Sequence, residues 1–64
     1  MSTQAFQYLV KEIDKLREDQ VVFLANGGAK DFAEYRHVCG VIRGLTHAEQ
    51  LVKDLVQKME RSDE

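Results

Sequence analysis

The 64-residue sequence contains no proline and no tryptophan, and it contains only one cysteine, Cys39. A single cysteine excludes a disulfide within the chain, so the covalent staples of many small secreted domains are missing. No apolar run approaches the roughly 18 residues that span a bilayer, so no membrane-spanning role is expected. The formal net charge is only −2, with both signs interspersed. Nucleic-acid binding, which normally needs a clustered basic surface, is therefore not expected either.

Residue patterns that carry catalysis or hold a cofactor are also missing. His37 and Cys39 lie two positions apart, which on a helix turns their side chains to nearly opposite sides, and His47 lies more than two turns further on. These three residues therefore predict no metal site. Cys39 has no positioned base and is expected to be a small buried hydrophobic residue. Because no phosphate loop, catalytic carboxylate pair or nucleophile elbow is recognisable, the sequence predicts no enzyme, no cofactor and no small-molecule substrate.

Apolar residues in the first part of the chain recur in alternating steps of three and four, which is the period of a helix. Ser2 or Thr3 can cap its start, and Gly27 can supply the left-handed residue that ends it. These signals predict a helix from about residue 3 to about residue 26. Its inward-facing line is expected to be Phe6, Leu9, Ile13, Leu16, Gln20 and Phe23, widened by Val10 and Leu24.

A second helix is predicted from about residue 30 to about residue 61, after a turn at about 26–30. Asp31 and Glu34 have the spacing of a capping box, although Gly28 is an alternative cap. Glu49 and Gln20 fall in the seams and are expected at their edges, in contact with water, rather than buried to fix the register. The expected core line is Tyr35, Val38, Ile42, Leu45, Val52, Val56 and Met59, and beside it run Val41, Ala48 and Leu55.

The short turn makes the two helices antiparallel. The predicted fold is all-α, a single antiparallel two-helix hairpin of coiled-coil type over residues 1–64. Its apolar stripe is wider than one helix can cover, and a chain this short rarely obtains more than about 3–5 kcal/mol from its own core. We therefore expect oligomerisation or docking on a larger protein to complete the hairpin.

Small residues align along the second helix at steps of four, which places Gly40, Gly44 and Ala48 after Arg36. Two glycines inside a helix cost roughly 2 kcal/mol relative to alanine. Such a ridge lets a second backbone approach closer than the usual distance of about 8–10 Å, although glycines can also be incidental or kink a helix. A basic strip lies beside the ridge and consists of Arg36, Arg43 and His47. This strip can bind an acidic partner surface, or it can simply face solvent. The candidate protein-interaction residues are Arg36, Gly40, Arg43, Gly44, His47 and Ala48.

The stretch AKDFAEYRHVCGVIRGL, residues 29–45, resembles a run found in a group of short proteins of tailed bacteriophages. This chain has Phe32 where that run more often has tyrosine. The aligned residues are Lys30, Asp31, Phe32, Ala33, Glu34, Tyr35, Arg36, His37, Val38, Cys39, Gly40, Ile42, Arg43, Gly44 and Leu45.

The resemblance implies a product of the structural and head-assembly genes, located in the virion or the host cytoplasm. The expected function is a virion or morphogenesis protein that packs onto a larger phage structural protein, such as the portal, the head-to-tail connector or the capsid. The alternatives are a small adaptor that modulates a host enzyme, and a free-standing homo-oligomeric helical bundle.

Overall fold

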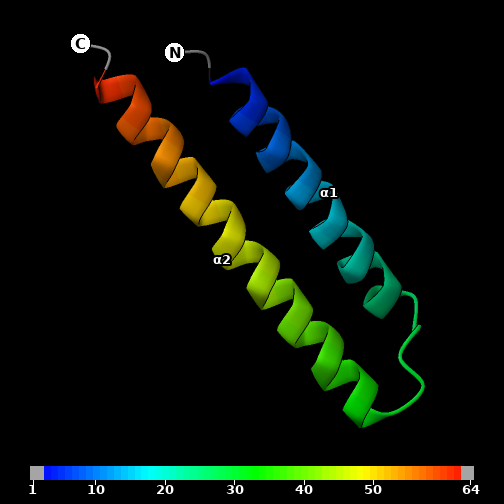
Figure 1. Cartoon of the computed structure of the whole chain (residues 1–64). Coiled ribbons are helices and arrows are strands. Elements are labelled where there is room, and N and C mark those ends of the chain that lie inside the picture. The colour runs from blue at the N-terminus through cyan, green and yellow to red at the C-terminus, as the bar shows by residue number, and fades with distance from the viewer. Residues whose placement is uncertain (1–2, 63–64) are drawn as a thin grey trace.

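The computed structural model describes residues 3–62, and in that range the chain forms two α-helices and no strand (Figure 1). Helix α1 spans Gln4–Ala25 and helix α2 spans Phe32–Ser62. The helices lie antiparallel, with the beginning of α1 and the end of α2 at the same end of the molecule. The predicted all-α helical hairpin is confirmed. Helix α2 begins at residue 32 rather than at about 30, so the connection is longer than the sequence predicts.

Helix α1 ends in a Schellman motif. Gly27 has a φ of 72°, in the left-handed region that favours glycine. The Gly28 N–H donates a hydrogen bond of 2.8 Å to the Phe23 carbonyl, and the Gly27 N–H donates one of 3.0 Å to the Leu24 carbonyl. These bonds satisfy carbonyls that a helix end leaves without a partner. The predicted left-handed conformation of Gly27 is confirmed.

Asp31, rather than Gly28, caps the start of α2. The Glu34 N–H donates to Asp31 Oδ1 at 2.8 Å, and the Glu34 carboxylate in turn accepts a bond of 3.1 Å from the Lys30 N–H. This is the reciprocal arrangement of a capping box, displaced by one residue. At the start of α1, Thr3 occupies the cap position but its side chain makes no capping bond, so its predicted role is wrong. Ser2, the alternative, lies outside the described residues.

Helix α1 turns only part of the predicted line of residues toward α2. Leu9, Leu16 and Phe23 are 44%, 54% and 39% exposed, so their predicted place in the core is wrong. The half-buried line keeps three predicted members, and in place of the other three it has the residues that follow them, two of which were expected to widen the stripe. It consists of Phe6, Val10, Ile13, Arg17, Gln20 and Leu24.

Helix α2 presents the expected core line with one exception. Tyr35 is 46% exposed, whereas the other members are buried or half-buried. Cys39 is only half-buried, so its predicted burial is not complete. The seam residues of α2 are Val38, Ile42, Leu45, Glu49, Val52, Val56 and Met59.

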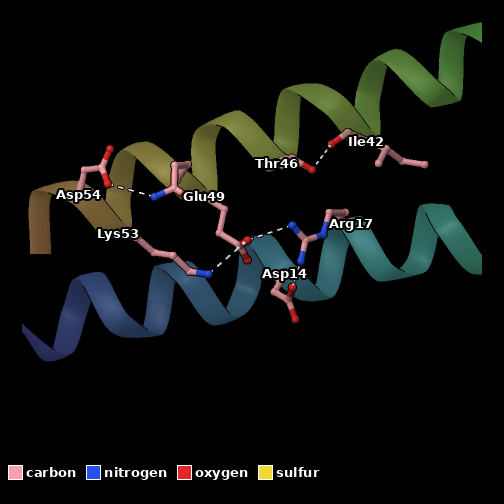
Figure 2. A network of polar contacts seen from close by, with 8 residues as sticks. Asp14, Arg17, Ile42, Thr46, Glu49, Lys53 and Asp54 are labelled. Carbon is pink, nitrogen blue, oxygen red and sulfur yellow. Dashed lines mark hydrogen bonds and ion pairs between the residues drawn. The ribbon is translucent and has the colours of Figure 1, made fainter. Parts of the chain in front are cut away.

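A charged pair crosses the middle of the seam (Figure 2). Arg17 Nη1 donates a hydrogen bond of 2.9 Å to Glu49 Oε1, and the Glu49 side chain is only 8% exposed. The other guanidinium nitrogen, Nη2, bonds Asp14, and Lys53 Nζ lies 3.6 Å from Glu49 Oε1. Among the described residues, no buried side-chain nitrogen or oxygen lacks a hydrogen-bond partner. The expectation that Glu49 reaches water is therefore wrong, because Arg17 replaces the water.

The Arg17–Glu49 contact defines the register, and the register leaves α2 overhanging α1. Only 8 residues separate Arg17 from the end of α1 at Ala25, whereas 17 separate Glu49 from the start of α2 at Phe32. Helix α2 therefore continues for 9 residues, about 13 Å, beyond the last turn of α1. Residues 26–31 span that distance (Figure 1). We call residues 32–40 the overhang.

Candidate interaction surfaces

The hairpin buries very little of itself. Among the described residues, only Val38, Val56 and Glu49 are buried, and none of the buried residues belongs to α1. The chain exposes 5039 Å², compared with about 4,200 Å² for a compact monomer of its 7.4 kDa mass. The excess follows from the elongated shape, which measures 51 × 15 × 12 Å. Most side chains of the hairpin are therefore available to contact another molecule.

The two sides of the hairpin differ in polarity. On one side lie Gln7 and Lys53, which line an open hollow of about 280 Å³ between the helices, and Asp14, which bonds Arg17. On α1, Leu9 and Leu16 each follow a residue of this polar side by two positions, about 200° around the helix. They therefore lie on the opposite side of the hairpin.

The same reasoning places an apolar row of α2 on that opposite side. Leu55 follows Lys53 by two positions, and Ala48 and Val41 precede Leu55 at steps of seven. Leu55 is 43% exposed, and Ala48 and Val41 are half-buried. Because rows of seven-residue spacing stay on one side of a paired helix, the two rows form one continuous surface. We call this surface the apolar face, and it consists of Leu9, Leu16, Phe23, Val41, Ala48 and Leu55.

The apolar face has two outer edges, one on α1 and one on α2, which we call its rims, and they differ in charge. On α1, Glu12 and Asp19 lie three positions after Leu9 and Leu16, which puts two carboxylates along the outer edge. On α2, the corresponding positions are Gly44, Leu51 and Lys58. Leu51 is 70% exposed, so it extends the apolar surface outward. The α1 rim is therefore acidic, and the α2 rim is small, apolar and basic.

A second cluster of exposed residues lies on the overhang and on the next helical turn of α2, which contains Arg43. Phe32 and Tyr35 are 72% and 46% exposed, and their rings stack with centroids 6.1 Å apart. A hydrogen bond with the Cys39 side chain raises the pKa of the Tyr35 hydroxyl above its ordinary value of 10.0. Five residues line an open hollow of about 250 Å³: Tyr35, Arg36, Cys39, Gly40 and Arg43. With Phe32, these residues form what we call the overhang patch.

The candidate interaction residues divide between these surfaces. Steps of four advance by about 40° around a helix, so a ridge of four such residues turns through about 120°. Arg36, Gly40 and Arg43 accordingly line the overhang patch, whereas Gly44 and Ala48 lie at the apolar face. The remaining candidate, His47, is exposed between them on the outer side of α2.

Both helical glycines are open to an approaching partner. A β-carbon added to Gly40 or to Gly44 would meet nothing within 4 Å. Helix α1 therefore does not use the predicted groove, and close packing against another molecule stays a prediction.

Sequence reasoning missed Arg17, although a signal for it was present. Glu49 interrupts the core line of α2, and a buried carboxylate requires a cation or several donors. Arg17 is the one cationic residue in the observed inner line of α1. Searching that line for a partner of Glu49 identifies it.

No metal site or membrane span is found in the described part of the chain. Residues 3–62 contain no group of three or more histidine, cysteine, aspartate or glutamate side chains placed to hold a metal ion. Neither helix combines the length and the apolar character needed to cross a membrane over the residues described. No protein-family model, curated protein or solved structure matches this chain.

Proposed function

We propose that this chain is a small non-enzymatic protein of tailed bacteriophages that packs onto a larger structural protein of the particle. The overhang patch carries the proposal. It combines two exposed stacked aromatic rings and Arg36, on a part of α2 that α1 does not reach, with Arg43 one helical turn beyond that part. Aromatic residues and arginine are the residue types that contribute most of the binding energy at protein interfaces.

The charge of the patch indicates the kind of surface it binds. None of the ion pairs between described residues involves Arg36 or Arg43. A guanidinium can bind a carboxylate through two parallel hydrogen bonds, so a partner with exposed aspartate or glutamate suits both arginines. All six residues of the overhang patch lie within residues 29–45, the stretch that resembles the phage proteins. The portal, the head-to-tail connector and the capsid are the candidate partners.

The direct test is mass spectrometry of particles from the phage whose genome encodes the chain. We expect the chain in mature virions or in assembly intermediates. Lys30, exposed beside the patch, should form amine cross-links to one larger structural protein. The Phe32→Ala/Arg36→Ala double variant should be lost from the particles while its far-ultraviolet circular dichroism stays helical.

Arg61→Ala is the matched control, because Arg61 is an exposed arginine at the other end of α2. It should be incorporated normally. Absence of the chain from both mature particles and intermediates contradicts the proposal. Recovery of one host enzyme in stoichiometric amount through the overhang patch would identify the chain as a host-directed adaptor instead.

A further inference from the structure

We propose that the apolar face binds a second copy of this chain. In the complex, α1 of each hairpin lies on α2 of the other, and the four helices form an antiparallel bundle. The apolar face is separate from the overhang patch, so this inference does not rest on the proposed function.

The exposed area matches what a stable dimer needs. The hairpin exposes 5039 Å², roughly 800 Å² more than a compact monomer of its mass. A protein–protein interface of standard size buries about 800 Å² on each partner. Association through one side of the hairpin would therefore reduce its exposed surface to that of a compact protein. The side that is apolar over the length of α1 is the one suited to this burial.

The two rows of the apolar face are complementary in shape. The α1 row carries the large side chains of Leu9, Leu16 and Phe23, whereas the middle of the α2 row is narrow at Ala48, with Gly44 beside it. Because the helices are antiparallel, Leu16 and Ala48 each lie one residue from the Arg17–Glu49 contact but in opposite directions, so their heights along the hairpin differ by about 3 Å.

A two-fold axis parallel to the helices preserves height and lays α1 of one copy on α2 of the other. Leu16, which is 54% exposed, then packs against the second copy within about 3 Å of the height of Ala48. Phe23 lies six residues after Arg17 and Gly44 five residues before Glu49, so the two are at nearly the same height. Gly44 has the space to receive Phe23, because nothing lies within 4 Å of where its β-carbon would be. The small residues that cost helix stability in the isolated hairpin thus allow close packing in the dimer.

Charge distinguishes this arrangement from the other two-fold arrangement. An axis perpendicular to the helices would lay α1 on α1 and bring Glu12 and Asp19 of one copy against the same carboxylates of the other. Like charges brought together at an interface disfavour a complex. Laying α1 on α2 instead brings the carboxylates to the α2 rim, which carries Lys58 and no acidic residue.

Sedimentation equilibrium of the full chain tests the dimer. We expect a mass of twice 7.4 kDa at concentrations of about 100 μM, with dissociation on dilution. Leu16→Gln should raise the dissociation constant about tenfold or more. Val22→Gln is the matched control, because Val22 is 46% exposed on α1 but lies outside the apolar face, and it should leave the constant unchanged.

Circular dichroism at matched concentrations shows whether each variant remains helical. A wild-type chain that stays monomeric at about 100 μM overturns the proposal. So does a Leu16→Gln variant that remains helical and associates as tightly as the wild type, and so does a trimer or a larger species.

The sign of a charge-reversal effect tests the arrangement. Glu12→Lys should weaken the dimer about two- to fivefold if α1 lies on the basic α2 rim, because the register places Glu12 within about 6 Å of the height of Lys58. The same substitution would strengthen a dimer in which α1 lies on α1, because the new lysine would meet Asp19 of the second copy. Glu18→Lys, an exposed position outside the rim, makes the same charge change and should have little effect. A strengthened Glu12→Lys dimer overturns the proposed arrangement.

Discussion

The contribution of the Arg17–Glu49 pair to the stability and register of the hairpin can be measured. Replacing the two residues by leucine, singly and together, gives a double-mutant cycle. In the structure, Arg17 Nη1 lies 2.9 Å from Glu49 Oε1, and the two side chains are 26% and 8% exposed. The pair is therefore asymmetric, with a well-buried carboxylate and a partly exposed guanidinium. The two single variants should differ for that reason.

Arg17→Leu should be the damaging substitution. It leaves the Glu49 carboxylate in the seam with only Lys53 Nζ, 3.6 Å away, as a neighbouring cation. Removing one member of a fully buried pair typically costs 3–5 kcal/mol, and we expect about 2 kcal/mol here because Arg17 is partly exposed. Glu49→Leu should cost under about 1 kcal/mol, because Arg17 keeps Asp14 and can extend its guanidinium to water.

The double variant should be more stable than the wild type by about 1–3 kcal/mol, because leucines at both positions complete an apolar seam. Urea unfolding followed by circular dichroism at one protein concentration measures all three variants. Native mass spectrometry of the double variant should show additional oligomeric states, since a polar seam pair specifies register and partner number. An Arg17→Leu variant as stable as the wild type, or strictly additive effects, would refute this reasoning.

Substitutions at three further positions test local features of the fold. Gly28→Ala should destabilise by about 1–3 kcal/mol in thermal unfolding, because its β-carbon would lie 2.7 Å from the Phe23 carbonyl oxygen. Asp31→Ala should lower the free energy of unfolding by about 1 kcal/mol through loss of the cap, whereas Asp31→Asn should retain most of it. Gly40→Ala should raise the free energy of unfolding by up to about 1 kcal/mol, because the site is open and alanine favours the helix. If Gly40 meets the partner of the overhang patch, the same substitution should weaken that binding; unchanged binding would show that this glycine is dispensable there.

The hairpin itself could be predicted from the sequence because its signals are local. The alternating steps of three and four identify the helices, and Gly27 and Asp31 mark the turn through their own backbone chemistry. The inward-facing line of α1 could not be identified in this way. Two lines of the same period share Phe6, Ile13 and Gln20, and hydrophobicity alone favours the line that adds Leu9, Leu16 and Phe23.

The choice between those lines depends on contacts distant in sequence. A helix with two apolar rows can bury either of them first, and hydrophobicity does not say which row meets the helix of the same chain. The Arg17–Glu49 pair distinguishes them, because only the observed line places a cation opposite the seam carboxylate. The division of the candidate residues between two surfaces likewise depends on where α1 ends along α2, which is a consequence of register.

The unequal ends of the hairpin give it a direction that experiments can use. At one end, the first turn of α1 and the last turn of α2 are flush, since Gln4 and Ser62 each lie 13 residues from the Arg17–Glu49 contact. At the other end, α2 projects beyond the last turn of α1 (Figure 1), and this part of α2 bears the rings of Phe32 and Tyr35 together with Arg36. A fluorophore or affinity handle joined before α1 or after α2 would be carried at the flush end, most of the 51 Å length away from the projecting tip. The molecule could thus be immobilised through its flush end, with the overhang exposed to binding partners.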